Sequence, residues 1–199
     1  MHAELLAQTD PATASGRYDG VAMGLHWLLV LMLVSSFSVG LYMTELPMSP
    51  IRLKVYNWHK WAGVTILALS TLRLGWRLAH PPPALPPAIA AAMRGWQQRV
   101  FHGTHRLLYL LFFAVPLFGW AHSSALGFPI VWFGVLPLPD FVPVDRALAE
   151  VLKLLHVGSA FTLAGLVLLH VAATLKHQFI DRDGLMARMW PARRDGRAS

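Results

Sequence analysis

The chain has 199 residues, of which 55% are hydrophobic and 14% charged, and its mean hydropathy is +0.47. A water-soluble domain carries about a quarter charged residues, so this composition argues against an ordinary soluble globule and favours a single membrane domain. The absence of cysteine excludes disulfides, thiolate metal sites, iron–sulfur clusters and covalently attached c-type haem. The formal net charge is +7, but long apolar runs separate the basic residues, so we expect membrane lipid and no nucleic acid as a partner.

Four segments are long and apolar enough to cross a bilayer, which needs about 20 such residues in a helix. In chain order they cover residues 21–43, 58–78, 106–122 and 154–175. We therefore expect an all-α fold, a four-helix transmembrane bundle over residues 17–191. An N-terminal extension (1–16) precedes it and a basic tail (192–199) follows it.

The connections between these segments differ in character. A proline-rich loop begins at His80, and we expect a short interfacial helix over residues 88–100 after it. Residues 123–145 contain four prolines and are expected to form a loop at the membrane surface. Twelve lysines and arginines fall on the side that holds both termini and the proline-rich loop, against five on the other side. The positive-inside rule then places both termini in the cytoplasm.

Histidines lie inside the predicted spans, where ionisable residues are costly and mark function. His156 and His170 are fourteen residues apart, so both rings share one helix face and lie about 21 Å apart along the axis. That separation is too large for one metal ion and fits two sites at different depths. Matching the depths across helices pairs His59 with His156 towards the outside, and His26 with His170 towards the cytoplasm.

Two imidazoles that face each other across a helix bundle are the ligands of a six-coordinate b-type haem. We interpret the two pairs as two such sites. Small residues beside them would let a flat macrocycle approach the backbone: Gly24, Gly63, Gly158 and Gly165. Two alternatives stay open: His105 replaces His26 as a ligand, or the histidines hydrogen-bond between helices as packing residues.

The same residues carry a resemblance to a known family. The segment Gly24-Leu25-His26-Trp27-Leu28 resembles the opening of bacterial cytochrome b561 proteins. So do His59 early in the second span, the pair Arg73 and Arg77 before the proline-rich loop, the spacing of His156 and His170, and the closing segment 185–191. The resemblance covers residues 17–191 and is closest to the short, free-standing type, of which superoxide oxidase is the example. It implies two haem b groups on His26, His59, His156 and His170, in a multi-pass protein of the bacterial inner membrane.

The resemblance further implies electron transfer to ubiquinone, with superoxide oxidised to dioxygen at the periplasmic side. Arg52, Lys54 and Lys60 would then attract the superoxide anion, although ordinary solvated charge explains them as well. Arg77, Lys176 and His177 would bind the quinone and supply protons to it, although the two cations also suit contact with lipid headgroups. The alternative function is an electron-transfer subunit of a larger dehydrogenase or hydrogenase complex, with a protein redox partner.

Overall fold

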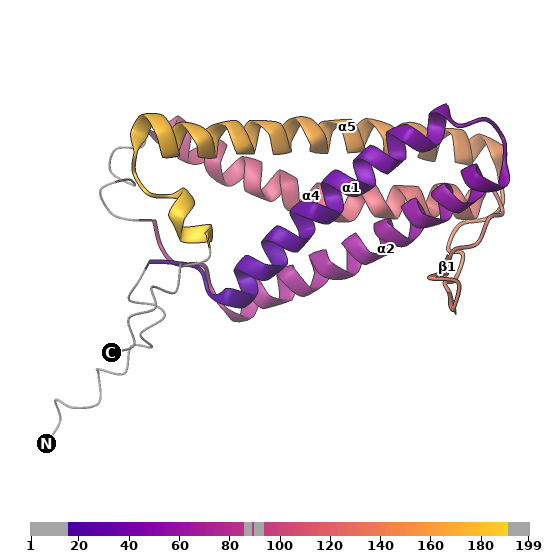
Figure 1. Cartoon of the computed structure of the whole chain (residues 1–199), viewed down its shortest axis with the longest axis horizontal. Coiled ribbons are helices and arrows are strands. Elements are labelled where there is room, and N and C mark those ends of the chain that lie inside the picture. The colour runs from indigo at the N-terminus through magenta and orange to yellow at the C-terminus, as the bar shows by residue number, and fades with distance from the viewer. Residues whose placement is uncertain (1–15, 86–88, 90–93, 191–199) are drawn as a thin grey trace, which may run out of the picture.

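The computed structural model describes residues 16–85, 89 and 94–190. Four long helices dominate this part of the chain (Figure 1): α1 (Gly20–Glu45), α2 (Pro50–Ala79), α4 (Gly95–Ala125) and α5 (Arg146–Lys176). A π-helical turn, η1 (His177–Asp181), extends α5, and a 3₁₀ turn, η2 (Met186–Met189), follows it. The strands β1 (Val131–Trp132) and β2 (Leu136–Pro137) pair antiparallel between α4 and α5.

All four predicted spans lie inside these helices, which confirms a mostly helical fold. Three helices are long and apolar enough to cross a membrane, namely α1, α4 and α5 with its extension η1. Helix α2 does not reach that threshold because basic residues lie along it, among them Lys60, Arg73 and Arg77. The spanning role of α2 and the orientation of the termini therefore stay predictions.

Local sequence explains where the helices begin. Asp19 caps α1 by accepting a hydrogen bond from the Ala22 N–H at 2.9 Å, and Asp145 caps α5 through the Leu148 N–H at 3.0 Å. Ser49 caps α2, whose first residue is Pro50, a residue that suits this position because its missing N–H would be unpaired there. The helices therefore begin at polar capping residues, which precede the apolar segments from which the spans were predicted.

The connections differ from their predictions in two places. Residues 95–100, expected in a separate interfacial helix, form the first turns of α4, and residues 86–88 and 90–93 lie outside the described part. The predicted surface loop 123–145 begins with the last turn of α4 and contains the β1–β2 hairpin. Gly127, at φ +73°, ends α4 by donating to Ser124 O, while Phe128 N donates to Ser123 O.

The helices pack as two antiparallel pairs, α1 with α2 and α4 with α5, and α2 also contacts α4. In Figure 1 the two pairs lie close together at the end that carries β1–β2, the hairpin end. They spread apart towards the end that carries η2 and the start of α1, the termini end. The buried core is small, and large apolar side chains such as Leu31 and Leu168 are exposed over most of their surface. Such exposed apolar side chains are compatible with helices that are surrounded by the lipid of a bilayer.

Candidate functional site

Two histidines face each other near the hairpin end. His59 lies in the third turn of α2 and His156 in the third turn of α5. Their ring centroids are 6.0 Å apart at an interplanar angle of 81°. Both side chains are only partly exposed. The structure thus brings together the pair that matching depths predicted.

Each of these rings is held by a backbone carbonyl of the neighbouring helix. His59 Nδ1 lies 3.1 Å from Ser36 O on α1, and His156 Nδ1 lies 2.9 Å from Val115 O on α4. Since a carbonyl oxygen only accepts, Nδ1 is the donor in both bonds, and each neutral ring keeps its lone pair on Nε2. Histidines that bind metals are oriented by such a bond through the other ring nitrogen.

This arrangement fits the ligand set of one haem iron. Because a metal–imidazole bond is about 2 Å long, two rings that would both hold one ion need centroids no more than roughly 6 Å apart, and the observed separation is 6.0 Å. In both rings the bond to a carbonyl is made by Nδ1, and Nε2 makes no hydrogen bond within the described residues. A role in helix packing alone would not require Nε2 to stay unbonded in both rings. The residues at the hairpin end therefore fit a b-type haem.

Three histidines gather towards the termini end. The rings of His105 on α4 and His170 on α5 have centroids 5.4 Å apart at 90°, whereas the ring contact of His26 is with Trp27 at 5.3 Å. The guanidinium of Arg73 lies within electrostatic range of all three histidines. The structure thus brings His105, rather than His26, against His170, and the pairing of His26 with His170 stays a prediction.

Arg77 lies in a cleft at the termini end, between the start of α1, the end of α2 and α4. Its guanidinium stands 5.4 Å from the ring centroid of Tyr109. The other main lining residues are Tyr18, Asp19, Arg73, Trp76 and His80. The cleft therefore combines two cations with aromatic walls.

Asp19 contributes the negative charge of this cleft. Partial burial alone would raise the pKa of Asp19, but hydrogen bonds from the Ala22 N–H and the Trp76 indole outweigh it and lower that pKa below its ordinary value. The carboxylate is consequently charged at neutral pH and fixes the indole of Trp76 at 3.1 Å. The Trp76 ring in turn stacks on His80, with centroids 3.9 Å apart.

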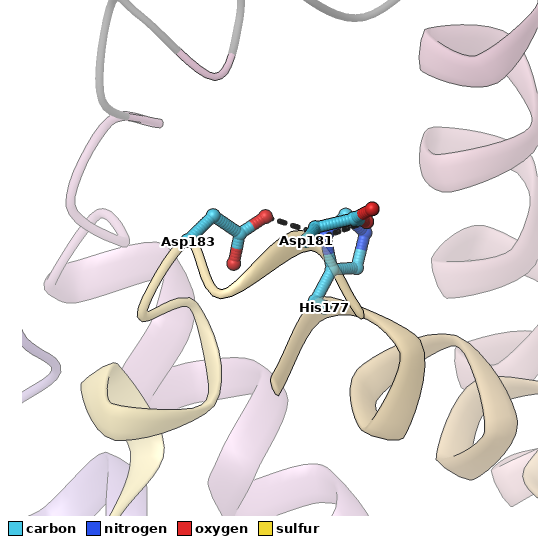
Figure 2. A group of neighbouring side chains, drawn as sticks. All are labelled: His177, Asp181 and Asp183. Atoms are coloured by element: carbon cyan, nitrogen blue, oxygen red, sulfur yellow. Dashed lines mark hydrogen bonds and ion pairs between the residues drawn. The ribbon is translucent and has the colours of Figure 1, made fainter. Parts of the chain in front are cut away.

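Lys176 and His177 occupy a different cluster, at the end of α5. Figure 2 shows His177 beside Asp181 and Asp183, with its Nδ1 at 3.2 Å and 2.5 Å from their carboxylate oxygens. Lys176 Nζ also binds Asp181, at 2.6 Å. His177, Asp181 and Asp183 have the geometry of a metal-ligand group, a feature that the sequence reasoning missed. No contact joins Arg77 to Lys176 or His177 within the described residues.

The three basic residues predicted to attract an anion lie on the first turns of α2. Arg52 donates to Leu46 O at 2.9 Å, and Lys60 donates to Phe128 O at 3.3 Å. Lys54 is exposed and makes no hydrogen bond or ion pair in the part of the chain that the structure describes. Lys54 is therefore the cation of this group that is most open to solvent.

The role of the four glycines indicated by the sequence stays a prediction, and two other glycines lie against the histidine rings. A Cβ built on Gly24, Gly63, Gly158 or Gly165 would meet no atom within 4 Å. A Cβ on Gly40 would instead lie 3.1 Å from His59 Cε1, and one on Gly119 would lie 2.9 Å from His156 Cε1. A run of apolar sequence gives no signal for these two contacts, because they depend on how the helices are rotated.

Comparison with known proteins gives consistent matches over nearly the whole chain. The profile of the prokaryotic cytochrome b561 family matches residues 17–192. "Cytochrome b561 homolog 2" of Escherichia coli (strain K12) is 31% identical over 174 residues, which cover 87% of this chain and 90% of the relative. "Probable superoxide oxidase CybB" of Yersinia pestis is 27% identical over 183 residues, covering 89% and 98%. "Cytochrome b561 homolog 1" of Escherichia coli (strain K12) is 26% identical over 181 residues, covering 89% and 99%.

Proposed function

Because the chain belongs to the prokaryotic cytochrome b561 family, whose members bind b-type haem and transfer electrons in membranes, we propose that it is a di-haem membrane oxidoreductase. His59 and His156 are the ligands at the hairpin end, and His26 and His170 those at the termini end. The observation that carries this proposal is the facing of His59 and His156, each with Nδ1 held by a carbonyl and Nε2 left for a metal. Haem iron supplies a one-electron carrier when it is bound.

The substrates follow from the relatives and from the charges at the two ends. One relative is named a probable superoxide oxidase, which favours superoxide as the electron donor. Ubiquinone is the acceptor that the sequence resemblance implies. Two superoxide anions each lose one electron and leave as dioxygen, and two electrons with two protons convert ubiquinone into ubiquinol. Lys54, with Arg52 and Lys60 beside it on α2, attracts the anion to the hairpin end.

The quinone head group binds in the cleft at the termini end. Arg77 there supplies a hydrogen-bond donor to a quinone carbonyl, and Tyr109 and Trp76 supply aromatic walls. Lys176 and His177, held by Asp181 and Asp183, serve the same reaction as a source of protons rather than as part of the cleft. In a bacterial inner membrane, the hairpin end then faces the periplasm and both termini face the cytoplasm, as the distribution of basic residues predicts.

The test is a reduced-minus-oxidised absorption spectrum of the purified protein, with the haem-to-protein ratio. We expect two b haems in the native chain and one in His59→Ala and in His156→Ala, because removal of one ligand leaves the other site intact. His122→Ala is the matched control, since His122 Nδ1 also bonds a carbonyl of a neighbouring helix, Ala149 O at 2.9 Å, but has no facing histidine in the described residues. A native chain without haem would overturn the proposal.

The same measurement decides the ligands at the termini end. Loss of the second haem in His26→Ala, with two haems kept in His105→Ala, supports the pair His26 and His170. The opposite result assigns His105 and would match the ring contact between His105 and His170. Superoxide-dependent reduction of ubiquinone by the native protein then tests the substrates, and its absence in a protein with both haems would refute them.

A second function, that of an electron-transfer subunit in a larger complex, draws on the exposed hairpin. Phe133 and Val135 at its tip are 58% and 83% exposed, as a surface that contacts a redox partner would be. Co-purification of an iron–sulfur protein would favour this function, whereas full activity of the isolated chain would favour the free-standing oxidoreductase.

A further inference from the structure

The two helix pairs hold the histidines of the hairpin end in the same way. In the first pair, His59 of α2 bonds the carbonyl of Ser36 on α1, and Gly40 lies four residues after Ser36. In the second pair, His156 of α5 bonds the carbonyl of Val115 on α4, and Gly119 lies four residues after Val115. The same spacing of carbonyl and glycine thus occurs twice, on two helices that show no repeat in sequence.

The spacing has a physical reason. In an α-helix the carbonyl of residue i points along the axis towards the N–H of residue i+4, so the side chain of residue i+4 stands beside that carbonyl. A glycine there leaves the carbonyl open to a second donor that approaches from another helix. In this chain the second donor is an imidazole, whose Nδ1 reaches the oxygen at 3.1 Å in one pair and 2.9 Å in the other.

The space left by each glycine is filled by the ring itself. A Cβ on Gly40 would stand 3.1 Å from Cε1 and 3.5 Å from Nδ1 of His59. A Cβ on Gly119 would stand 2.9 Å from Cε1 and 3.0 Å from Nδ1 of His156, which is closer than atoms of a rigid neighbour can lie. Any side chain at position 119 therefore requires the ring or one of the two helices to shift, which disturbs the bond between the ring and the Val115 carbonyl.

We propose that Gly40 and Gly119 are positioning residues that orient the two imidazoles at the hairpin end. Each keeps open the carbonyl one helical turn before it, Nδ1–H donates to that carbonyl, and Nε2 keeps the lone pair that binds a metal. The inference rests on the proposed function for the identity of that metal, haem iron. It assigns to the glycines an effect on the electronic state of the ligands, because a bond from Nδ1–H to a carbonyl makes the imidazole a stronger donor.

The test is a pair of alanine variants in the full-length, haem-loaded protein. Gly40→Ala requires a shift of a few tenths of an ångström, so we expect it to keep both haems. The midpoint potential of the haem at the hairpin end should be raised, because a weaker donor stabilises ferric iron less. Gly119→Ala requires a larger shift, and we expect a larger rise or loss of that haem alone. The low-spin ferric electron paramagnetic resonance signal of the same haem should change in parallel.

Matched controls lie on the same two helices. A Cβ at Gly20 on α1 or Gly103 on α4 would meet no atom within 4 Å, so Gly20→Ala and Gly103→Ala should leave the potential and the resonance signal of that haem unchanged. Alanine is also favoured over glycine in a helix by about 1 kcal/mol, so loss of helix stability does not explain the expected defects.

Three outcomes would overturn the inference. An unchanged potential and signal in both Gly40→Ala and Gly119→Ala would show that the glycines do not orient the rings. Equal loss of both haems in both variants would assign the glycines to helix packing alone. If the native chain itself lacked haem at the hairpin end, the proposed function would fail first, a result that is distinguishable because it requires no variant.

Discussion

Arg77 is the residue through which the position of the quinone head group is tested most directly. It combines a hydrogen-bond donor with a place in the cleft beside Tyr109, whereas Lys176 and His177 are held at the end of α5 by Asp181 and Asp183. A head group in the cleft would therefore contact Arg77 and not His177. The two residues should affect different kinetic constants.

We predict that Arg77→Gln raises the KM for ubiquinone about tenfold, since a lost hydrogen bond to a charged donor costs about 1.5 kcal/mol. His177→Ala should lower kcat and leave KM unchanged, because it removes a proton source and not a contact. Steady-state kinetics with a soluble ubiquinone analogue measures both, and the haem spectrum of each variant checks that the sites are intact. A raised KM in His177→Ala alone would place the quinone at the end of α5.

At the scale of elements, η2 and Trp190 connect several segments of the chain at the termini end. Arg188 donates to the carbonyls of Gly16, Pro83 and Ala84, and its own carbonyl accepts from Tyr18 N. The indole of Trp27, next to His26, donates to Met189 O, and the Trp27 and Trp190 rings meet edge to face at 5.4 Å. One arginine thus joins the N-terminal segment, the proline-rich loop and η2 at the termini end.

Arg188→Ala should release η2 from the N-terminal segment and from the proline-rich loop. Loss of hydrogen bonds from a charged donor costs about 1–3 kcal/mol, so the open state should become about tenfold more populated or more. Limited proteolysis by chymotrypsin after Leu185, at the start of η2, measures the change, because cleavage follows the open population when opening is fast. Arg182→Ala is the control, since the exposed side chain of Arg182 donates only a long bond, 3.4 Å, to Phe179 O in the described residues. Equal cleavage of the two variants would contradict the role of Arg188.

At the scale of the whole molecule, the charges at the hairpin end attract or repel a small anion while it approaches the protein. The basic residues of α2 there are opposed by acidic residues of the same end, including Asp140, Asp145 and Glu150. Any attraction must therefore come from local cations, of which Lys54 is the most open. Attraction between exposed charges is screened over about 10 Å at 0.1 M salt.

The rate of reaction with superoxide should fall severalfold between about 10 mM and 150 mM salt. Lys54→Gln should lower the rate at low salt and flatten this dependence. Lys153→Gln is the matched control, because Lys153 lies at the same end but pairs with Glu150 at 3.7 Å. Pulse radiolysis at several ionic strengths gives the rates, and a rate of the native protein that does not change with salt would refute the attraction.

Prediction from the sequence was most reliable where one local property decides the outcome. The apolar segments predicted helices because a chain in lipid must bond its own backbone, and all four segments are helical. Residues 95–100 were predicted in a separate helix but belong to α4, because hydropathy does not show that a polar first turn continues into an apolar helix. Residues 88 and 90–93 of that predicted helix lie outside the described part. The β1–β2 turn was missed as well, since Phe133 takes a positive φ of 52° that its residue type does not favour.

The sequence by itself determined the chemistry that this chain carries: four helical segments, no cysteine, and histidines at two depths of the predicted spans. The depth of a residue in the membrane follows from its position along a helix. The pairing of His59 with His156 could therefore be predicted from the sequence. Only the tertiary structure decided which ring lies against which, as with His105 beside His170, and which glycines receive the histidines. Those contacts depend on how the packed helices are rotated and how they cross. Hydropathy does not predict either property, because it indicates burial in lipid and not the direction in which a side chain points.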